Sequence, residues 1–422
     1  MPICSECNQE YGGYEGWHKP CNSKHFQNDF NNWTSGNDKI DKFIQDAQLN
    51  ANDYIEILEW IPYDRFKDVK QIGKGGFGTI HYARWIGGFI GEWDIENQQW
   101  KRQRNRDGEV GEVEMEIHLK TRDEAASIQF YGITQDPGTH SYMMILDYAK
   151  DGNLREYLKI NFNNINWKQK IRNLWELSLR LMKIHKFDIV HQDFHPGNIL
   201  SYDFKNYSIQ ISDFGLSKLI GENPNNPEKK NIFGVLPYIA PEVLSGEVYT
   251  KAADVYSYGI VAYEIVTGFP PYPDIPHDKN LAMSICNGLR PKIPFHTPKL
   301  ITRMIMRCWD ARVTYRPTFE ELYSDYYNYF DKGKNEDSEI VIQIKKAEEF
   351  STNQKSTDTI ITPLNYQTHP QAIYTSRLLN FSKLPKPKNE ENFERELEEL
   401  TKSMSSLCPS DSGIVDLDMS SF

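Results

Sequence analysis

The sequence predicts an α+β fold class, because strand-like and helical segments occupy separate stretches of the chain. Strand-like text begins at Phe66 and meets a glycine cluster at Gly73–Gly78, and Met143–Leu146 is typical of a buried strand. Long apolar patterns of helical period follow at 167–184, 253–267 and 299–309. At 422 residues the chain is long enough for two or three domains, or for one large domain with tails.

The formal charge of −11 is concentrated at the two ends of the chain. Residues 1–65 carry 5 basic and 11 acidic side chains, and residues 331–422 carry 11 and 16, so the centre is balanced. The acidic total argues against bulk attraction to nucleic acid or anionic lipid. We therefore expect no nucleic-acid partner.

Residues 1–36 form a Cys/His-rich arm with a candidate metal site. Cys4, Cys7, His18 and Cys21 follow a C-x₂-C…H-x₂-C pattern. Three thiolates and one imidazole suit a tetrahedral structural Zn²⁺ site. The alternative, free thiols in a flexible arm with a solvated His18, stays open on the sequence.

Residues 37–65 are predicted to be a helical linker. Apolar residues recur at spacings of three and four from Ile40 to Ala47, and Asn37 or Asp38 is a suitable N-cap.

Gly73, Gly75 and Gly78 form a G-x-G-x-x-G loop, in which backbone amides can approach phosphates without side-chain obstruction. A dinucleotide-binding fold would have this loop open a helix. Here Ile80 and Trp85 follow within β-type text, which favours strand–loop–strand. A polar insertion at about 86–112 comes next.

Three further motifs follow in order: His191–Asn198, Asp213–Gly215 and Ala240–Glu242. Their order and spacing resemble the protein kinase signature set, and Asp254 and Arg316 match two more family positions. The resemblance covers residues 66–330 and is nearest to the tyrosine-kinase-like group. The flanking text is similar to a large expanded fungal set of such kinases.

The resemblance implies a two-lobed protein kinase fold with a small β-rich N-lobe, a larger helical C-lobe and flexible flanks. The implied activity is transfer of the ATP γ-phosphoryl group, with Mg²⁺, to protein hydroxyls in intracellular signalling, Ser/Thr rather than Tyr. The alternative is a pseudokinase that acts as a nucleotide- or partner-binding scaffold. A small-molecule phosphotransferase of related fold is a third reading.

Family roles transfer to matching positions of this chain. Asp193 would accept or orient the substrate hydroxyl proton, while Asn198 and Asp213 offer oxygen ligands for Mg²⁺. The residues placed around the nucleotide are Ile72, Gly73, Gly75, Gly78, Ile80, Asp147, Ala149 and Leu200. The residues given supporting roles are Glu114, His191, Glu242, Asp254 and Arg316, of which Glu242 and Arg316 would pair.

The sequence departs from the family at the third strand, where a lysine normally anchors the ATP phosphates. That position falls between Trp93 and Gln98, a stretch without lysine. Gly108–Glu116 resembles late helix C, with Glu114, or alternatively Glu116, as the usual lysine partner. Either a segment is missing through exon loss or a faulty gene model, or the kinase is degenerate. Lys74 could reach inward as a substitute, or be a solvated loop lysine.

Other departures concern regulation and specificity. Gln192 replaces the arginine of H-R-D, so pairing with a phosphorylated loop is not expected. His195 and Val235 replace the lysine and threonine typical of Ser/Thr kinases, so both partners of one family interaction differ in this chain.

Residues 331–422 are predicted to be a mostly disordered polar tail. The chain shows no apolar run long enough for a membrane span and no secretory signal, and six cysteines do not make a disulfide scaffold. These observations predict a soluble, cytoplasmic protein.

Overall fold

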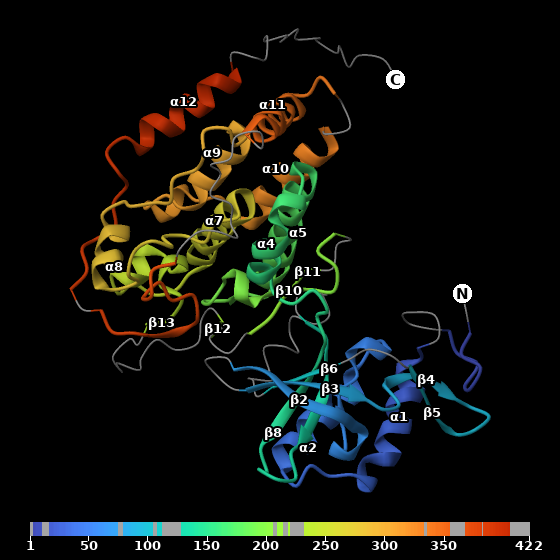
Figure 1. The fold of residues 1–422 in the computed structure, drawn as a ribbon. Helices are drawn as coiled ribbons and strands as arrows, with labels where there is room; N and C mark the ends of the chain where they lie inside the picture. The colour runs from blue at the N-terminus through green and yellow to red at the C-terminus, as the bar shows by residue number, and fades with distance from the viewer. Residues whose placement is uncertain are drawn as a thin grey trace, which may run out of the picture.

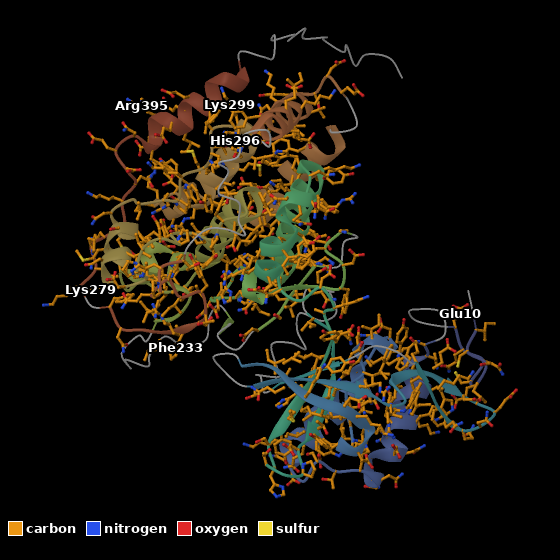
Figure 2. All side chains as sticks on the ribbon, viewed as in Figure 1. Glu10, Phe233, Lys279, His296, Lys299 and Arg395 are labelled. Atoms are coloured by element: carbon orange, nitrogen blue, oxygen red, sulfur yellow. The ribbon has the colours of Figure 1, made fainter. Side chains whose placement is uncertain are left out.

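The computed structural model describes residues 3–10, 17–74, 79–103, 108–111, 128–205, 209–213, 218–219, 232–332, 336–354, 368–381 and 383–405. These residues form a β-rich lobe from the N-terminal part of the chain and a larger helical lobe from the remainder (Figure 1). Figure 2 shows the described side chains of both lobes as sticks on the ribbon. Over the part of the chain described, no helix is long and apolar enough to cross a membrane.

The small lobe is built on a six-stranded sheet with the strand order β1-β7-β8-β6-β3-β2. Its strands are β1 (Glu59–Trp60), β2 (Phe66–Lys74), β3 (Thr79–Trp85), β6 (Gly108–Gly111), β7 (Phe130–Gln135) and β8 (Tyr142–Asp147). β1 runs parallel to β7, and the other pairs are antiparallel. β2 and β3 form the hairpin that flanks the glycine loop.

Residues 37–65 are a layer of this lobe rather than a linker. Helix α2 (Asp38–Asn50) begins where the Asn37 side chain accepts hydrogen bonds from two backbone amides of the first turn. Ile44 on α2 packs with Leu58, Phe130 and Met144 in a shared apolar cluster. The helix therefore covers one part of the sheet, and β1 extends it.

The segment predicted as a polar insertion contains a hairpin, β4 (Phe89–Asp94) and β5 (Gln99–Gln103), docked on helix α1 (Lys19–Asp29). Its tryptophans supply the apolar contacts: Trp93 stacks on His25 with ring centroids 3.8 Å apart, and Trp100 stacks on Phe26 at 4.4 Å. Polar composition hid this hairpin, because a few large aromatic side chains provide its packing.

The prediction that Gly108–Glu116 continues helix C is wrong for Gly108–Gly111. This stretch is strand β6, which bridges β3 and β8 at the centre of the sheet. Two glycines in four residues disfavour a helix, while the neighbouring strands each provide backbone partners. Glu114 lies outside the described residues.

The large lobe packs its helices around α7 (Lys251–Thr267), most of whose residues are buried. On α7, Gly259 allows a close approach to α9, because a Cβ there would lie 2.7 Å from the Cβ of Cys308. The remaining helices are α4 (Leu154–Asn161), α5 (Trp167–Lys186), α6 (Pro241–Leu244), α8 (Lys279–Cys286), α9 (Lys299–Cys308) and α10 (Phe319–Lys332). The short strands are β9 (Ile189–Val190), β10 (Ile199–Ser201), β11 (Ile209–Ile211), β12 (Lys218–Leu219) and β13 (Ile232–Gly234).

The tail was expected to be mostly disordered, but its described residues are folded onto the large lobe. They form α11 (Glu339–Gln354), β14 (Arg377–Leu379) and α12 (Phe393–Ser405), drawn in orange to red in Figure 1. Leu379 and Phe393 are buried in the main core cluster. Sparse apolar residues at suitable spacings thus anchor a segment whose average composition is polar.

Candidate active site

The loop after β9 is fixed by one buried carboxylate. Asp254 on α7 accepts hydrogen bonds from the backbone amides of His191 at 2.8 Å and Gln192 at 3.1 Å. The Nε2 atom of His185 on α5 lies 2.9 Å from the same carboxylate. Asp254 thereby ties the loop to two core helices.

His191 connects this loop to the segment after β11. Its Nδ1 accepts from the backbone amide of Asp193 at 3.3 Å, so the proton of the neutral ring is on Nε2, which donates to the Ser212 carbonyl at 3.1 Å. Complete burial lowers the pKa of His191 below its ordinary value and outweighs the attraction of Asp254, Asp193 and Asp213. The imidazole therefore acts as a neutral spacer.

The hairpin of β10 and β11 brings Asn198 and Asp213, which have oxygen-bearing side chains, to the same end of the hairpin. The backbone amide of Ser212 donates to the Asn198 carbonyl at 2.9 Å, and Asp213 is the next residue, in a left-handed conformation with φ of 60°. The Asn198 side-chain amide donates to the Asp193 carbonyl at 3.0 Å. Asp193, Asn198 and Asp213 are thus brought together at one end of this hairpin.

The Asp193 carboxylate is 4% exposed and has two polar neighbours. The hydroxyl of Ser376, from the tail, donates a hydrogen bond to its Oδ2 atom. His195 Nε2 lies 3.6 Å from Oδ1. Burial raises the pKa of Asp193, but attraction to His195 and hydrogen bonds from His195 and Ser376 outweigh it, so the pKa lies below the ordinary value.

Sequence reasoning missed Ser376 as part of this site. It is 183 residues from Asp193 and stands in polar text without a recognisable motif. His195 was noted only as a replacement for lysine, yet its Nε2 lies 3.2 Å from Ser376 Oγ. Only the three-dimensional arrangement reveals both contacts.

A cavity of about 820 Å³ lies between the β2–β3 hairpin and the end of β8. Its lining includes Ile72 and Asp147, two of the predicted nucleotide-binding residues, together with Lys70, Tyr82, Tyr148, Lys150 and Tyr202. Ile80, Ala149 and Leu200 are not among the lining residues. Gly73 is the pairing partner of Ile80 in the hairpin, whereas Gly75 and Gly78 lie outside the described residues.

The central strand of the small lobe carries no lysine. β6 consists of Gly108, Glu109, Val110 and Gly111 and lies between β3 and β8. In the described part of the cavity wall, Lys70 on β2 holds its Nζ atom 5.0 Å from the centre of the Tyr82 ring. The side chain of Lys74 is outside the described part of the chain.

Glu242 and Arg316 form a buried two-pronged ion pair. The Nη1 and Nη2 atoms of Arg316 lie 2.6 and 2.7 Å from the two carboxylate oxygens of Glu242. Arg316 Nε also donates to the Asp310 carbonyl at 2.8 Å. This pair joins α6 to the turn that precedes α10.

Cys4, Cys7, His18 and Cys21 converge in the N-terminal arm, with one potential ligand atom of each within 4.8 Å of the others. The Sγ atoms of Cys4 and Cys21 are 4.0 Å apart, and His18 Nδ1 lies 3.5 Å from Cys7 Sγ and 3.0 Å from Cys21 Sγ. With Zn–S bonds of about 2.3 Å, a tetrahedral site places its sulfurs about 3.8 Å apart. The donor set and its spacing fit zinc.

The thiol of Cys4 accepts hydrogen bonds from the backbone of its own turn. Burial raises the pKa of its thiol, but hydrogen bonds from the backbone amides of Cys7 and Glu6 bring it below the ordinary value. Such amides stabilise the thiolate, which is the form that binds metal.

A β-rich lobe with a glycine-flanking hairpin, a helical lobe, and an Asp–Asn–Asp set at their junction define a protein kinase. The comparison with known families agrees. Residues 66–326 match the family described as protein tyrosine and serine/threonine kinase, and the chain belongs to this family.

Individual relatives carry both kinds of kinase name. The chain is 28% identical over 270 residues to the putative serine/threonine-protein kinase/receptor R826 of Acanthamoeba polyphaga mimivirus, covering 63% of this chain and 15% of that protein. It is 30% identical over 285 residues to the tyrosine-protein kinase SPK-1 of Girardia tigrina, covering 65% and 53%. It is 26% identical over 302 residues to the dual specificity protein kinase pyk3 of Dictyostelium discoideum, covering 69% and 21%. The match therefore spans only part of each relative.

Proposed function

We propose that this chain transfers the γ-phosphoryl group of ATP to serine or threonine hydroxyls of proteins. The observation that carries the proposal is the Asp193 carboxylate, which is buried and accepts a hydrogen bond from a serine hydroxyl. A general base must lie within hydrogen-bond reach of the proton it removes, and Asp193 meets that condition. Its lowered pKa keeps it ionised at neutral pH.

The family implies the use of ATP and Mg²⁺, and this chain has residues suited to both. The cavity beside Ile72 and Asp147 is large enough for a nucleotide. Asn198 and Asp213 would hold the cation through an amide oxygen and a carboxylate, the oxygen ligands that Mg²⁺ prefers. When bound, Mg²⁺ neutralises charge that develops on the phosphates.

A serine hydroxyl at Asp193 favours Ser/Thr over Tyr. The absence of a lysine from β6 predicts weaker phosphate anchoring than a kinase with a third-strand lysine provides.

The test compares Asp193→Asn with a matched substitution, Asp188→Asn, under Mg·ATP and an added protein substrate. Asp188 precedes the loop, is exposed and pairs with Lys251 at the surface. We expect Asp193→Asn to lower transfer of labelled phosphate by about 10²–10⁴-fold, the usual worth of a general base. Asp188→Asn should retain the rate, since asparagine tolerates the left-handed backbone of this position.

Equal, negligible transfer by the wild type and Asp193→Asn would contradict the enzymatic function. If Mg·ATP then still raised the melting temperature, the chain would be a nucleotide-binding scaffold.

We also infer that Cys4, Cys7, His18 and Cys21 bind one structural Zn²⁺. The support is the convergence of four ligand atoms of the right type and spacing in a chain segment that packs on the small lobe. The metal content of the purified protein tests this inference: about one zinc per chain agrees with it, and metal-free protein with an intact arm contradicts it.

A further inference from the structure

The tail adds a strand next to the active site. β14 pairs antiparallel with β13, and Arg377 is the pairing partner of Gly234. The orange-red tail runs beside β13 in Figure 1, and Phe233 marks this strand in Figure 2. An extended peptide that adds to a strand edge is a common mode of peptide recognition, in which the backbone pairing fixes the register.

This register brings the residue before Arg377 to the catalytic carboxylate. Gly234 has a φ of 137°, and a Cβ at this position would lie only 3.3 Å from Asp193 Oδ1. Because Arg377 is paired with Gly234, Ser376 falls beside Asp193, and its hydroxyl donates to Oδ2. A residue with a side chain at position 234 would crowd this approach.

His195 orients the same hydroxyl. The backbone amide of Gly197 donates to His195 Nδ1 at 3.0 Å, so Nε2 is the ring nitrogen that carries a proton. Nε2 lies 3.2 Å from Ser376 Oγ and is placed to donate to it. The serine oxygen thus receives a hydrogen bond from His195, which fixes its orientation, and its own hydroxyl donates to Asp193, the proposed base.

Contacts on both sides of Ser376 hold the segment in place. On the N-terminal side, the Tyr374 carbonyl accepts from Arg155 Nη1 at 2.8 Å, and the Tyr374 hydroxyl donates to the Pro271 carbonyl at 2.9 Å. His277 Nδ1 lies 2.9 Å from the Ile373 carbonyl. On the C-terminal side, Leu379 is 4% exposed within the main core.

We propose that residues 368–381 are a built-in substrate segment of this kinase and that Ser376 is its phosphoryl acceptor. The inference rests on the proposed function, which supplies ATP. In the step, the bond from the γ-phosphorus to the β,γ-bridging oxygen breaks and a bond to Ser376 Oγ forms. The hydroxyl proton goes to Asp193 Oδ2, and the products are ADP and phosphoserine.

The docked segment has a consequence for other substrates. While Ser376 is at Asp193, no second protein hydroxyl can occupy that position. After transfer, a phosphate of about −1.5 to −2 charge would face the buried carboxylate, and like-charge repulsion would favour release of the segment. Phosphorylation of Ser376 would thus open the site to other protein substrates.

The test incubates the intact chain with Mg·ATP and maps the modified residue by mass spectrometry. We expect phosphate on Ser376, with a rate constant independent of protein concentration, because the acceptor belongs to the same molecule. Thr375→Ala removes the neighbouring exposed hydroxyl and should leave the labelling of Ser376 unchanged. Ser376→Ala should abolish it.

A second measurement follows phosphate transfer to casein. Ser376→Ala should keep this rate low, because its segment cannot be phosphorylated and stays docked; this variant is the baseline for the comparison. Leu379→Asp, which removes a buried anchor, should give a rate severalfold above that baseline. If the melting temperature shows that Leu379→Asp is unfolded, Ser376→Glu replaces it, since its charge should also release the segment. An unchanged casein rate in a folded release variant would overturn the occlusion of the site.

The remaining outcomes separate this inference from the proposed function. Labelled casein with no phosphate on Ser376 would overturn the acceptor assignment alone. In a mixture of wild type with a tagged Asp193→Asn chain, phosphate on Ser376 of the tagged chain would overturn transfer within one molecule. No label on either substrate would overturn the proposed function, and the acceptor assignment with it.

Discussion

At the scale of single residues, the ion pair of Glu242 and Arg316 shows how charge can fix a structure without exposure to solvent. The side chains are 4% and 0% exposed, respectively. Burial of such a pair is costly, and its Coulomb attraction and hydrogen bonds roughly offset that cost. The pair therefore matters most when one partner is removed.

We predict that Arg316→Ala destabilises the protein by about 3–5 kcal/mol, because it leaves the Glu242 carboxylate buried without its partner. The control is Arg84→Ala, whose ion pair with Asp68 at 2.9 Å has side chains 60% and 64% exposed. An exposed pair contributes about 0–1 kcal/mol. Urea unfolding of both variants measures the difference, and similar losses would contradict the prediction.

The proposed catalytic residues illustrate what sequence reasoning can and cannot reach at this scale. Asp193, Asn198 and Asp213 were predicted from motifs, since each motif is short and its spacing is encoded locally. Ser376 depends on a strand pairing between segments far apart in the chain. No local pattern encodes such a pairing, so only the folded structure reveals it.

At the scale of elements, the N-terminal arm and the β4–β5 hairpin stabilise one another. Trp93 and Trp100 on the hairpin pack against His25 and Phe26 on α1, which begins directly after His18. Arg102 on β5 forms an ion pair with Glu59 at 2.6 Å, which connects the hairpin to β1. The proposed zinc ligands therefore adjoin the packing of the small lobe.

We predict that removal of zinc weakens the packing of α1 against the β4–β5 hairpin. A ligand substitution, Cys7→Ser, should lower the zinc content and change the tryptophan fluorescence, because α1 would lose the cluster that fixes its start. Cys286→Ala is the control, since Cys286 is buried in the large lobe, far from the cluster in sequence. Unchanged fluorescence in zinc-free Cys7→Ser would contradict this coupling.

Two of the elements that sequence reasoning misjudged, β6 and β14, share one physical cause. β6 and β14 are short, and their pairing with neighbouring strands, rather than their own propensity, makes them strands. The long helices α5, α7 and α9 were predicted because their apolar text extends over several turns, amphipathic in α5 and α9 and apolar on most sides in α7. The periodicity of apolar residues in a sequence therefore predicts long elements well and short strands between other strands poorly.

At the scale of the whole molecule, the tail contacts the large lobe at several places along its length. Asn389 bridges Asp310 and Ala311, with distances of 2.8 and 2.7 Å. Glu394 at the start of α12 forms an ion pair with Arg312 at 2.8 Å. Part of the acidic charge of the tail is therefore used in contacts with the large lobe.

The stability of the whole molecule depends on pH through buried titratable groups, and Lys170 on α5 is one such group. Burial lowers the pKa of Lys170 to about 7, against the opposing attraction of Glu348 on α11. His296 also lies near enough for the Lys170 charge to lower its pKa, although burial is the larger cause. The Lys170 ammonium group donates to the Val266 carbonyl at 2.9 Å, so three helices surround it.

We predict that the free energy of unfolding rises with pH between about 7 and 10 because of Lys170. In this window the folded state binds fewer protons at Lys170 than the unfolded state does, so an increase in pH favours folding. The contribution is at most about 1.4 kcal/mol per pH unit. Lys170→Met should flatten the rise, since methionine fills similar space without a titratable group. Urea unfolding at several pH values measures both slopes, and equal slopes in wild type and Lys170→Met would show that Lys170 is not the cause.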